Sequence, residues 1–349
     1  MNKGPVRSLA VIGLAKNVGK TTVLCGLAER EAAVGRSLGI LSIGVDGEEW
    51  DVWSLKPKPV VMIPPGCLVA TAASLLDERG GDWELVESTP FYSPLGRVTL
   101  ARARRRTRIK LAGVTRTEEV REVIARLLAQ GAERVLVDGA YDRRAAASPW
   151  VTDAAVCVAG AVMAHSLDGV MEKMEEAIRL ITLPEAKDPL LRSAAEAARV
   201  GGRVVGIRKG RLETLPFTSL LLADRVRSMW TAGEWEGLAL PGSLTDRGLE
   251  LLASAANRPP AVVLTDPTRS FVSLTALRRF YRKGGTLSYL KGVRLAAVAV
   301  NPVSPDGYAF DPEEMKERAA RICAPVPVFD AIRDQAEVLD GINQCLSGG

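Results

Sequence analysis

The chain has 349 residues, of which 47% are hydrophobic and 25% charged, and its formal net charge is +5. These values are ordinary for a globular protein and leave room for one large α/β domain or two smaller ones. No apolar run reaches the length of a membrane-spanning helix, so we expect no membrane association.

The five cysteines are scattered and never form a Cys-x-x-Cys pair. This usage argues against a zinc site or a disulfide framework and favours a reducing compartment. The chain enters an apolar run at Leu9 without a visible signal peptide, so we expect a cytoplasmic location. The single histidine, His165, nearly excludes histidine-based metal clusters and Ser-His-Asp chemistry, and we expect it to be structural.

The first predicted elements are a strand at 9–12, a glycine-rich turn and a helix at 22–33. Together they predict a phosphate-binding loop, because successive backbone N–H groups and a helix N-terminus favour an anion at one place. Lys20 can reach the β- and γ-phosphates, and the Thr21 hydroxyl can join a Mg²⁺ shell. The residues expected to contact the nucleotide here are Gly13, Lys16, Asn17, Val18, Gly19, Lys20, Thr21 and Thr22.

The second predicted strand, 38–43, leads into a short acidic segment. An acid at this place faces the same sheet edge as the phosphate loop, so Asp46 is a candidate site residue and Glu48 a second choice. A turn aspartate before Gly47 is the alternative. The Lys56-Pro-Lys58-Pro segment that follows is either beside a bound anionic substrate or an exposed rigid loop.

Arginines gather at 102–108, where every second residue would share one face of an extended strand. A nucleic-acid patch is one interpretation of this cluster. Because no aromatic residues are interleaved and an apolar run follows, we favour a solvated edge strand that resists edge pairing. Nucleic acid is therefore not an expected partner.

The apolar strand predicted at 135–138 ends in Asp138. In proteins with a phosphate loop such an aspartate supports Mg²⁺, usually through water, so Asp138 is a metal candidate beside Thr21. A plain strand-end aspartate is the alternative. Arg143 follows closely and could stabilise developing phosphate charge or hold a partner, with a surface role left open.

Short apolar strands alternate with helical patterns along the chain. This predicts an α/β fold with a doubly wound, mostly parallel sheet. We expect a nucleotide-binding half at 1–182, a connection at 183–202, and a C-terminal α/β half at 203–349 that continues the same sheet. The remaining predicted strands are 60–63, 109–112, 155–159, 204–207, 238–240, 261–265, 294–300 and 326–329.

Five residues separate Gly13 from Gly19, one more than in the usual phosphate loop. This spacing resembles the dethiobiotin synthetase and cobyric acid synthase branch of the SIMIBI class of P-loop NTPases. The resemblance implies that Asp46 helps to position Mg²⁺ or the attacking water, and that Asn301, after a late strand, reads the adenine edge. The sequence has no Asn-Lys-x-Asp guanine motif, so ATP is favoured over GTP. The signature lysine of the related ATPases is replaced by Ala15, and Lys16 is not assigned that role.

A narrower resemblance rests on the phosphate loop, on 42–48, on Lys58-Pro59, and on Asp138-Gly-Ala with the Arg143 that follows. These segments look like the P-loop subunit of the lysine 5,6-aminomutase reactivase. The resemblance implies an ATPase that works beside a MutS-like ATPase subunit and opens an adenosylcobalamin-dependent aminomutase to release damaged cofactor. It departs at Val45, where an arginine is expected. A homodimer is left open.

Two other functions are considered. A ligase like dethiobiotin synthetase would use ATP to activate a small carboxylate or carbamate in a pocket lined by Lys56 or Lys58. A Min-type positioning ATPase is disfavoured by Ala15 and by the lack of a basic amphipathic segment near the C-terminus.

Overall fold

The structure is a computed structural model, and it describes residues 6–44, 60–77, 80–139, 147–220, 235–254 and 258–334. The chain divides into two compact units. The first unit consists of residues 1–175 and 294–349, and the second unit consists of residues 176–293. The second unit is therefore an insertion in the sequence of the first.

The first unit is built on a nine-stranded sheet in the order β18-β17-β9-β1-β8-β2-β4-β6-β5. The strands from β18 to β4 in this order run parallel, and β6 and β5 close one edge in antiparallel pairs. The prediction of an α/β fold with a mostly parallel sheet is thereby confirmed. The strands are β1 (Ser8–Gly13), β2 (Leu38–Ser42), β4 (Leu68–Ala72), β5 (Trp83–Ser93), β6 (Gly96–Ala103), β8 (Arg134–Gly139), β9 (Ala154–Gly160), β17 (Leu295–Asn301) and β18 (Val328–Asp330).

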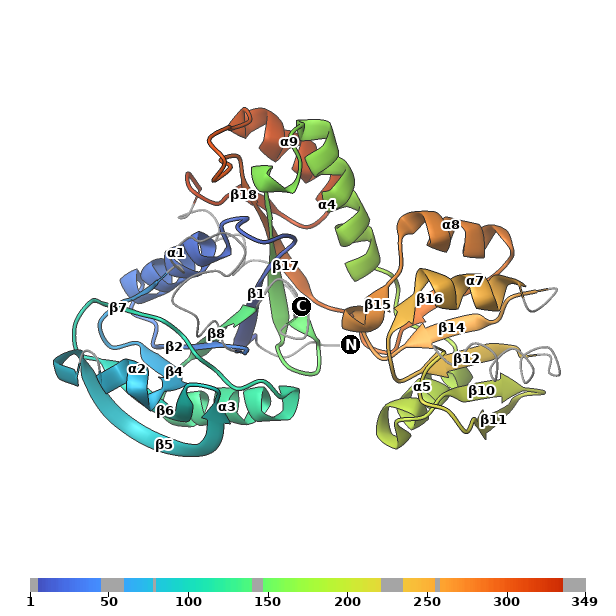
Figure 1. The fold of residues 1–349 in the computed structure, drawn as a ribbon, viewed down its shortest axis with the longest axis horizontal. Helices are drawn as coiled ribbons and strands as arrows, with labels where there is room; N and C mark the ends of the chain where they lie inside the picture. The colour runs from blue at the N-terminus through green and yellow to red at the C-terminus, as the bar shows by residue number, and fades with distance from the viewer. Residues whose placement is uncertain are drawn as a thin grey trace. The chain divides into compact units, whose positions relative to one another are not determined.

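Helices cover this sheet on both sides. Figure 1 shows α1 (Lys20–Ala33) on one face and α3 (Thr117–Ala129) on the other. Helix α9 (Pro312–Cys323) packs against β17 and β18. This double cover explains why β1 and β9 consist of buried residues along their whole length, as parallel strands do when both faces are packed.

The smaller elements of the first unit are a short antiparallel strand pair and single turns of helix. The pair joins β3 to β7, and β3 contacts α1. These elements are β3 (Val61–Ile63), α2 (Ala73–Asp77), η1 (Gly80–Asp82), β7 (Thr107–Ile109) and η3 (Ala161–Met163). The boundary between the two units falls within α4 (Leu167–Ile181).

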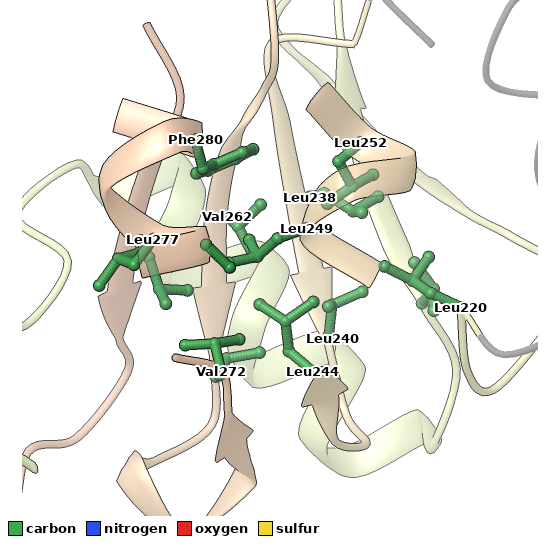
Figure 2. Packing of buried hydrophobic residues seen from close by; sticks show 14 of the residues in the cluster. Leu220, Leu238, Leu240, Leu244, Leu249, Leu252, Val262, Val272, Leu277 and Phe280 are labelled. Atoms are coloured by element: carbon green, nitrogen blue, oxygen red, sulfur yellow. The ribbon is translucent and has the colours of Figure 1, made fainter. Parts of the chain in front are cut away.

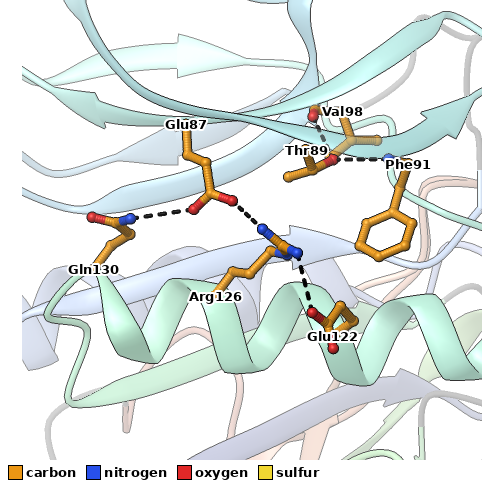
Figure 3. A network of polar contacts seen from close by, with 7 residues as sticks. All are labelled: Glu87, Thr89, Phe91, Val98, Glu122, Arg126 and Gln130. Atoms are coloured by element: carbon orange, nitrogen blue, oxygen red, sulfur yellow. Dashed lines mark hydrogen bonds and ion pairs between the residues drawn. The ribbon is translucent and has the colours of Figure 1, made fainter.

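A network of polar side chains joins α3 to the edge strand β5 (Figure 3). Arg126 forms an ion pair with Glu87 of β5 and a second one, at 3.2 Å, with Glu122 of its own helix. Gln130 Nε2 donates to the other oxygen of Glu87 at 3.2 Å. The Arg126 guanidinium lies 5.8 Å from the ring centroid of Phe91. These contacts hold the antiparallel edge of the sheet against the helix that precedes β8.

The second unit has its own five-stranded sheet in the order β11-β10-β12-β14-β16. Strands β12, β14 and β16 are parallel, while β10 and β11 pair antiparallel at one edge. A short parallel pair, β13 with β15, lies outside this sheet. The elements are α5 (Pro189–Gly201), β10 (Val205–Arg208), β11 (Arg211–Thr214), β12 (Gly237–Leu240), β13 (Leu244–Thr245), α7 (Asp246–Ser254), β14 (Ala261–Leu264), η4 (Pro267–Arg269), β15 (Ser270–Phe271), α8 (Leu274–Arg282) and β16 (Thr286–Tyr289).

A separate hydrophobic core fills the second unit (Figure 2). Leu252 of α7 and Phe280 of α8 lie over Leu238 and Val262 of the sheet, and all four are at most 1% exposed. Every residue of this cluster belongs to the second unit. A core made from its own residues is a property of a domain.

In the described ranges of the chain, no helix is long and apolar enough to span a membrane.

The observed division of the chain differs from the predicted one. The prediction that 203–349 continues the first sheet was wrong up to residue 293, since the described strands between 203 and 293 belong to other sheets, whereas β17 and β18 extend the first one. The predicted connection at 183–202 contains α5, which Asp188 caps and whose buried side chains are alanines. Alanines give a weak hydrophobic pattern, so the sequence did not reveal helix α5. An apolar strand does not show in its sequence which sheet it joins, so the second sheet could not be predicted either.

The prediction of an arginine-rich edge strand at 102–108 was also wrong. Strand β6 lies between β4 and β5, and the chain bends after Ala103 before β7 begins. Arg102 donates to the carbonyl oxygens of Gly66 and Gln130, and Arg105 pairs with the buried Asp82. Arg106 also forms an ion pair with Glu29, at 2.8 Å, so at least three of these arginines are used within the fold.

Candidate functional site

The segment between β1 and α1 forms a tight loop at the carboxyl edge of the first sheet, where β1 lies between β8 and β9. Asn17 and Gly19 have positive φ angles of 61° and 97°. Leu14 N donates to the Val158 carbonyl oxygen of β9 at 2.8 Å, and Val18, which is 1% exposed, anchors the loop. Left-handed residues within such a loop turn N–H groups toward a common point, and that arrangement favours an anion.

Helix α1 starts directly after this loop, with Gly19 as its N-cap. No side chain among the described residues caps its first turn. The first N–H groups of a helix have no acceptor within the helix, and the helix dipole adds partial positive charge there. Thr21 is half-buried in this turn, whereas Lys16, Asn17 and Thr22 are exposed. The open helix start and the exposed loop residues leave this point accessible to an anionic ligand.

Lys20, the first residue of α1, reaches across to the end of β8. Its Nζ lies 3.0 Å from Asp138 Oδ1 and also donates to the carbonyl oxygen of Gly139. The side chains of Lys20 and Asp138 are 18% and 16% exposed. Both charges are therefore partly shielded from water but still reachable, which strengthens their electrostatic influence on a ligand.

Asp138 is placed by the sheet. The chain after β2 pairs with it, because Ile43 N donates to the Asp138 carbonyl oxygen at 3.0 Å. No group of three or more His, Cys, Asp or Glu side chains that could hold a metal occurs within the described residues. Mg²⁺ needs fewer protein ligands, since it takes one or two carboxylates together with phosphate oxygens and water. Asp138 and the Thr21 hydroxyl fit that requirement.

Two residues from β9 and β17 hold the loop on its other side. A Cβ atom on Gly160, the last residue of β9, would lie 2.9 Å from the Val18 carbonyl oxygen. A Cβ atom on Gly19 would lie 2.7 Å from Nδ2 of Asn301, the last residue of β17. Only glycine permits such close approach of backbone and neighbour. Asn301 is therefore in direct contact with the predicted phosphate loop.

Cys25 lies one turn into α1, below the loop. Burial raises the pKa of its thiol, and the Met62 N–H that donates to Sγ opposes this shift. The negative charge of Asp138 adds to the rise. A neutral, partly buried thiol is a poor nucleophile, so Cys25 contributes packing to this edge of the sheet.

The structure thus brings most of the predicted site together. Asp46 and Arg143 lie outside the described residues, as do Glu48, Lys56 and Lys58, and the predictions for them stay predictions. The predicted site residues that gather at the carboxyl edge are Gly13, Lys16, Asn17, Val18, Gly19, Lys20, Thr21, Thr22, Asp138 and Asn301.

Sequence reasoning missed two glycines at this edge. The Gly139 carbonyl oxygen accepts from Lys20, and Gly160 lets the end of β9 approach Val18. Each is the last residue of a mostly apolar strand that lies next to β1, in the segments 135–139 and 154–160. A glycine in that position is the signal that could have drawn attention to them.

Comparison with models of known protein families gives no match, and comparison with curated proteins gives no similar sequence. This is an α/β protein whose large, mostly parallel sheet carries a glycine-rich loop, a lysine and an aspartate at its carboxyl edge.

Proposed function

We propose that this protein binds ATP with Mg²⁺ at the loop after β1 and hydrolyses it, as a P-loop NTPase of the dethiobiotin-synthetase-like SIMIBI class. The observation that carries the proposal is the position of Lys20. It begins a helix that no described side chain caps, and its Nζ lies 3.0 Å from Asp138. An open helix start, a lysine and an acid at one sheet edge are the parts that a phosphate chain with a metal ion requires.

Each part has its own task in this proposal. The N–H groups of the loop and of the first turn of α1 orient the phosphate chain, and Lys20 neutralises its terminal charge. A bound magnesium ion supplies charge neutralisation between the phosphates, and Asp138 and Thr21 hold it. The Lys20–Asp138 ion pair opens on binding, so that each partner meets the ligand group of opposite charge.

We further propose that ATP use serves an adenosylcobalamin-dependent aminomutase such as lysine 5,6-aminomutase. The protein acts there as a chaperone-like reactivase subunit beside a MutS-like ATPase subunit. The sequence resemblance of the loop and of the Asp138 segment supports this proposal.

The test is ATP hydrolysis by the purified protein, alone and with lysine 5,6-aminomutase plus a MutS-like subunit. We expect slow hydrolysis by the protein alone, a clear rise with the two partners, and a loss of about 100-fold or more in Lys20→Ala. Lys187→Ala, at an exposed lysine of the second unit, is the matched control and keeps the hydrolysis rate of the protein alone.

Two outcomes would change the conclusion. Hydrolysis that depends on Lys20 but does not change when both partners are added would rule out the reactivase function. It would leave a ligase like dethiobiotin synthetase, which activates a small carboxylate or carbamate with ATP. Equal rates for wild type and Lys20→Ala would remove the P-loop proposal itself.

A further inference from the structure

The side chain of Asn301, the last residue of β17, lies against Gly19, the N-cap of α1. If Gly19 carried a Cβ, that atom would lie 2.7 Å from Asn301 Nδ2, 3.3 Å from its Cγ and 3.4 Å from its Cβ. The Cβ, Cγ and Nδ2 atoms of Asn301 therefore all lie beside the Cα of Gly19. A contact this close fixes the position of Gly19 relative to the sheet.

The other end of the amide fixes its orientation. Asn301 Oδ1 accepts a hydrogen bond from Val303 N at 3.1 Å, which closes a turn over Pro302. An amide has one oxygen acceptor and one NH₂ donor group, and the hydrogen-bond pattern decides which atom is which. Because the oxygen serves the turn, the NH₂ group is the end that faces Gly19.

This orientation differs from the one that base reading requires. An asparagine that recognises adenine presents both ends of its amide to the same base edge. The two ends of Asn301 are directed to Val303 and to Gly19 instead. The expectation that Asn301 reads the adenine edge therefore has no support from this geometry.

We infer that Asn301 is a positioning residue for the phosphate loop, and that it contributes to recognition of the triphosphate chain and not to the choice of base. This inference rests on the function proposed for the same loop. Asn301 holds Gly19 from the β17 side, as Gly160 holds Val18 from the β9 side. Together they keep the loop N–H groups pointing at one place. Loss of the Asn301 side chain therefore weakens the binding of any ligand that the loop holds by its phosphates.

The test compares ATP, GTP and inorganic tripolyphosphate, each with Mg²⁺, by calorimetry on wild type and Asn301→Ala. We expect the variant to bind all three more weakly by the same factor, about tenfold or more, because hydrogen bonds to a charged group have that weight. Val303→Ala is the matched control, since it keeps its backbone N–H and alters an exposed side chain of the same turn. It keeps the wild-type affinities.

Three results would overturn the inference. In the first, Asn301→Ala lowers the affinity for ATP and leaves the affinity for tripolyphosphate unchanged. In the second, it changes the ratio of ATP to GTP affinity by about tenfold, as loss of a base contact does. It could also leave all three affinities at the wild-type value. The first two results would assign Asn301 to the base, and the third would leave it without a role in the site.

A second measurement needs no ligand and so separates this inference from the proposed function. Gly19→Ala should destabilise the wild type more than it destabilises Asn301→Ala, because the added methyl meets the amide only where the amide is present. Urea unfolding of the four proteins gives the difference. Additive effects would overturn the contact. Non-additive effects in a protein that binds neither ATP nor tripolyphosphate would overturn the triphosphate site and the proposed function together, and leave the contact intact.

Discussion

The two units each place a helix after a parallel strand, but they treat the start of that helix differently. In the first unit α1 begins at Lys20 with Gly19 as its N-cap, and no described side chain caps it. In the second unit Ser273 caps α8, because its Oγ accepts from Ala276 N at 3.1 Å. Asp246 in turn accepts from the backbone N and the hydroxyl of Ser273. One helix start is open to a ligand, and the other is closed by its own neighbours.

Two aspartates that follow or end parallel strands, one in each unit, differ in the same way. Asp266 follows β14 and is 2% exposed, and its carboxylate accepts from Thr268 N at 2.9 Å and from Thr265 Oγ1 at 3.2 Å. Asp138 at the end of β8 instead meets Lys20 from another element. A strand that ends in an acid is therefore weak evidence for a site. Stronger evidence for a site is an aspartate that pairs with a lysine from another element, where that lysine stands at the uncapped start of a helix.

The largest effect that would test this division lies in the core of the second unit. Phe280→Ala should lower the free energy of unfolding of that unit by about 3–5 kcal/mol, the cost of removing a fully buried aromatic ring. Since the cluster around Phe280 contains no residue of the first unit, the ATP binding that we propose should keep its wild-type affinity. Urea unfolding and ATP titration measure the two quantities, with the exposed Thr275→Ala as control. A parallel loss of ATP affinity would mean that the units share their stability.

A smaller effect is an alkaline pH dependence of the first unit that comes from a thiol, and the sequence of the second unit contains no cysteine. Burial raises the pKa of the Cys67 thiol in the first unit from 9.0 to about 11. Between these values the unfolded chain has lost the thiol proton and the folded chain has kept it. The contribution of this thiol to the free energy of unfolding is thus fully present below about pH 9 and is lost as the pH rises toward 11.

This shift corresponds to about 2–3 kcal/mol at its full extent. Urea unfolding at about pH 8 and about pH 10.5 should show a smaller alkaline loss for Cys67→Ala than for the wild type. Taking the difference between the two pH values removes the constant cost of the substitution. The same alkaline loss in both proteins would show that the Cys67 thiol keeps its ordinary pKa in the fold.

The sequence could predict those parts of the site whose information is local. The loop from Gly13 to Thr22 and the strand that ends at Asp138 are short continuous patterns, and the rule for parallel strands places them at one edge. The contacts of Gly160 with Val18 and of Asn301 with Gly19 were out of reach. The first brings two backbones together and the second brings a side-chain amide against a backbone, and residue types do not encode either approach.

The antiparallel edge was missed for a different reason. Strand β5 contains Pro90, and its pairing with β6 shifts register in two places. These irregularities break the alternation of apolar and polar residues on which strand prediction relies. The insertion of the second unit was hidden because its strands are as short and as apolar as those of the first sheet.

The smallest expected effect tests the contrast between the two helix starts most directly. Ser273→Ala removes the cap of α8 and should lower stability by about 1 kcal/mol, the usual cost of losing a hydroxyl N-cap. Helix α1 has no such hydroxyl at Gly19, so in our proposal a bound phosphate chain takes the place of the cap. ATP with Mg²⁺ should therefore raise the melting temperature by mass action, and by the same amount in wild type and Ser273→Ala, as thermal unfolding with and without ATP would measure. If the Ser273→Ala protein lost that rise, the start of α8 would belong to the ligand site, and the difference between an open and a closed helix start would no longer distinguish the two units.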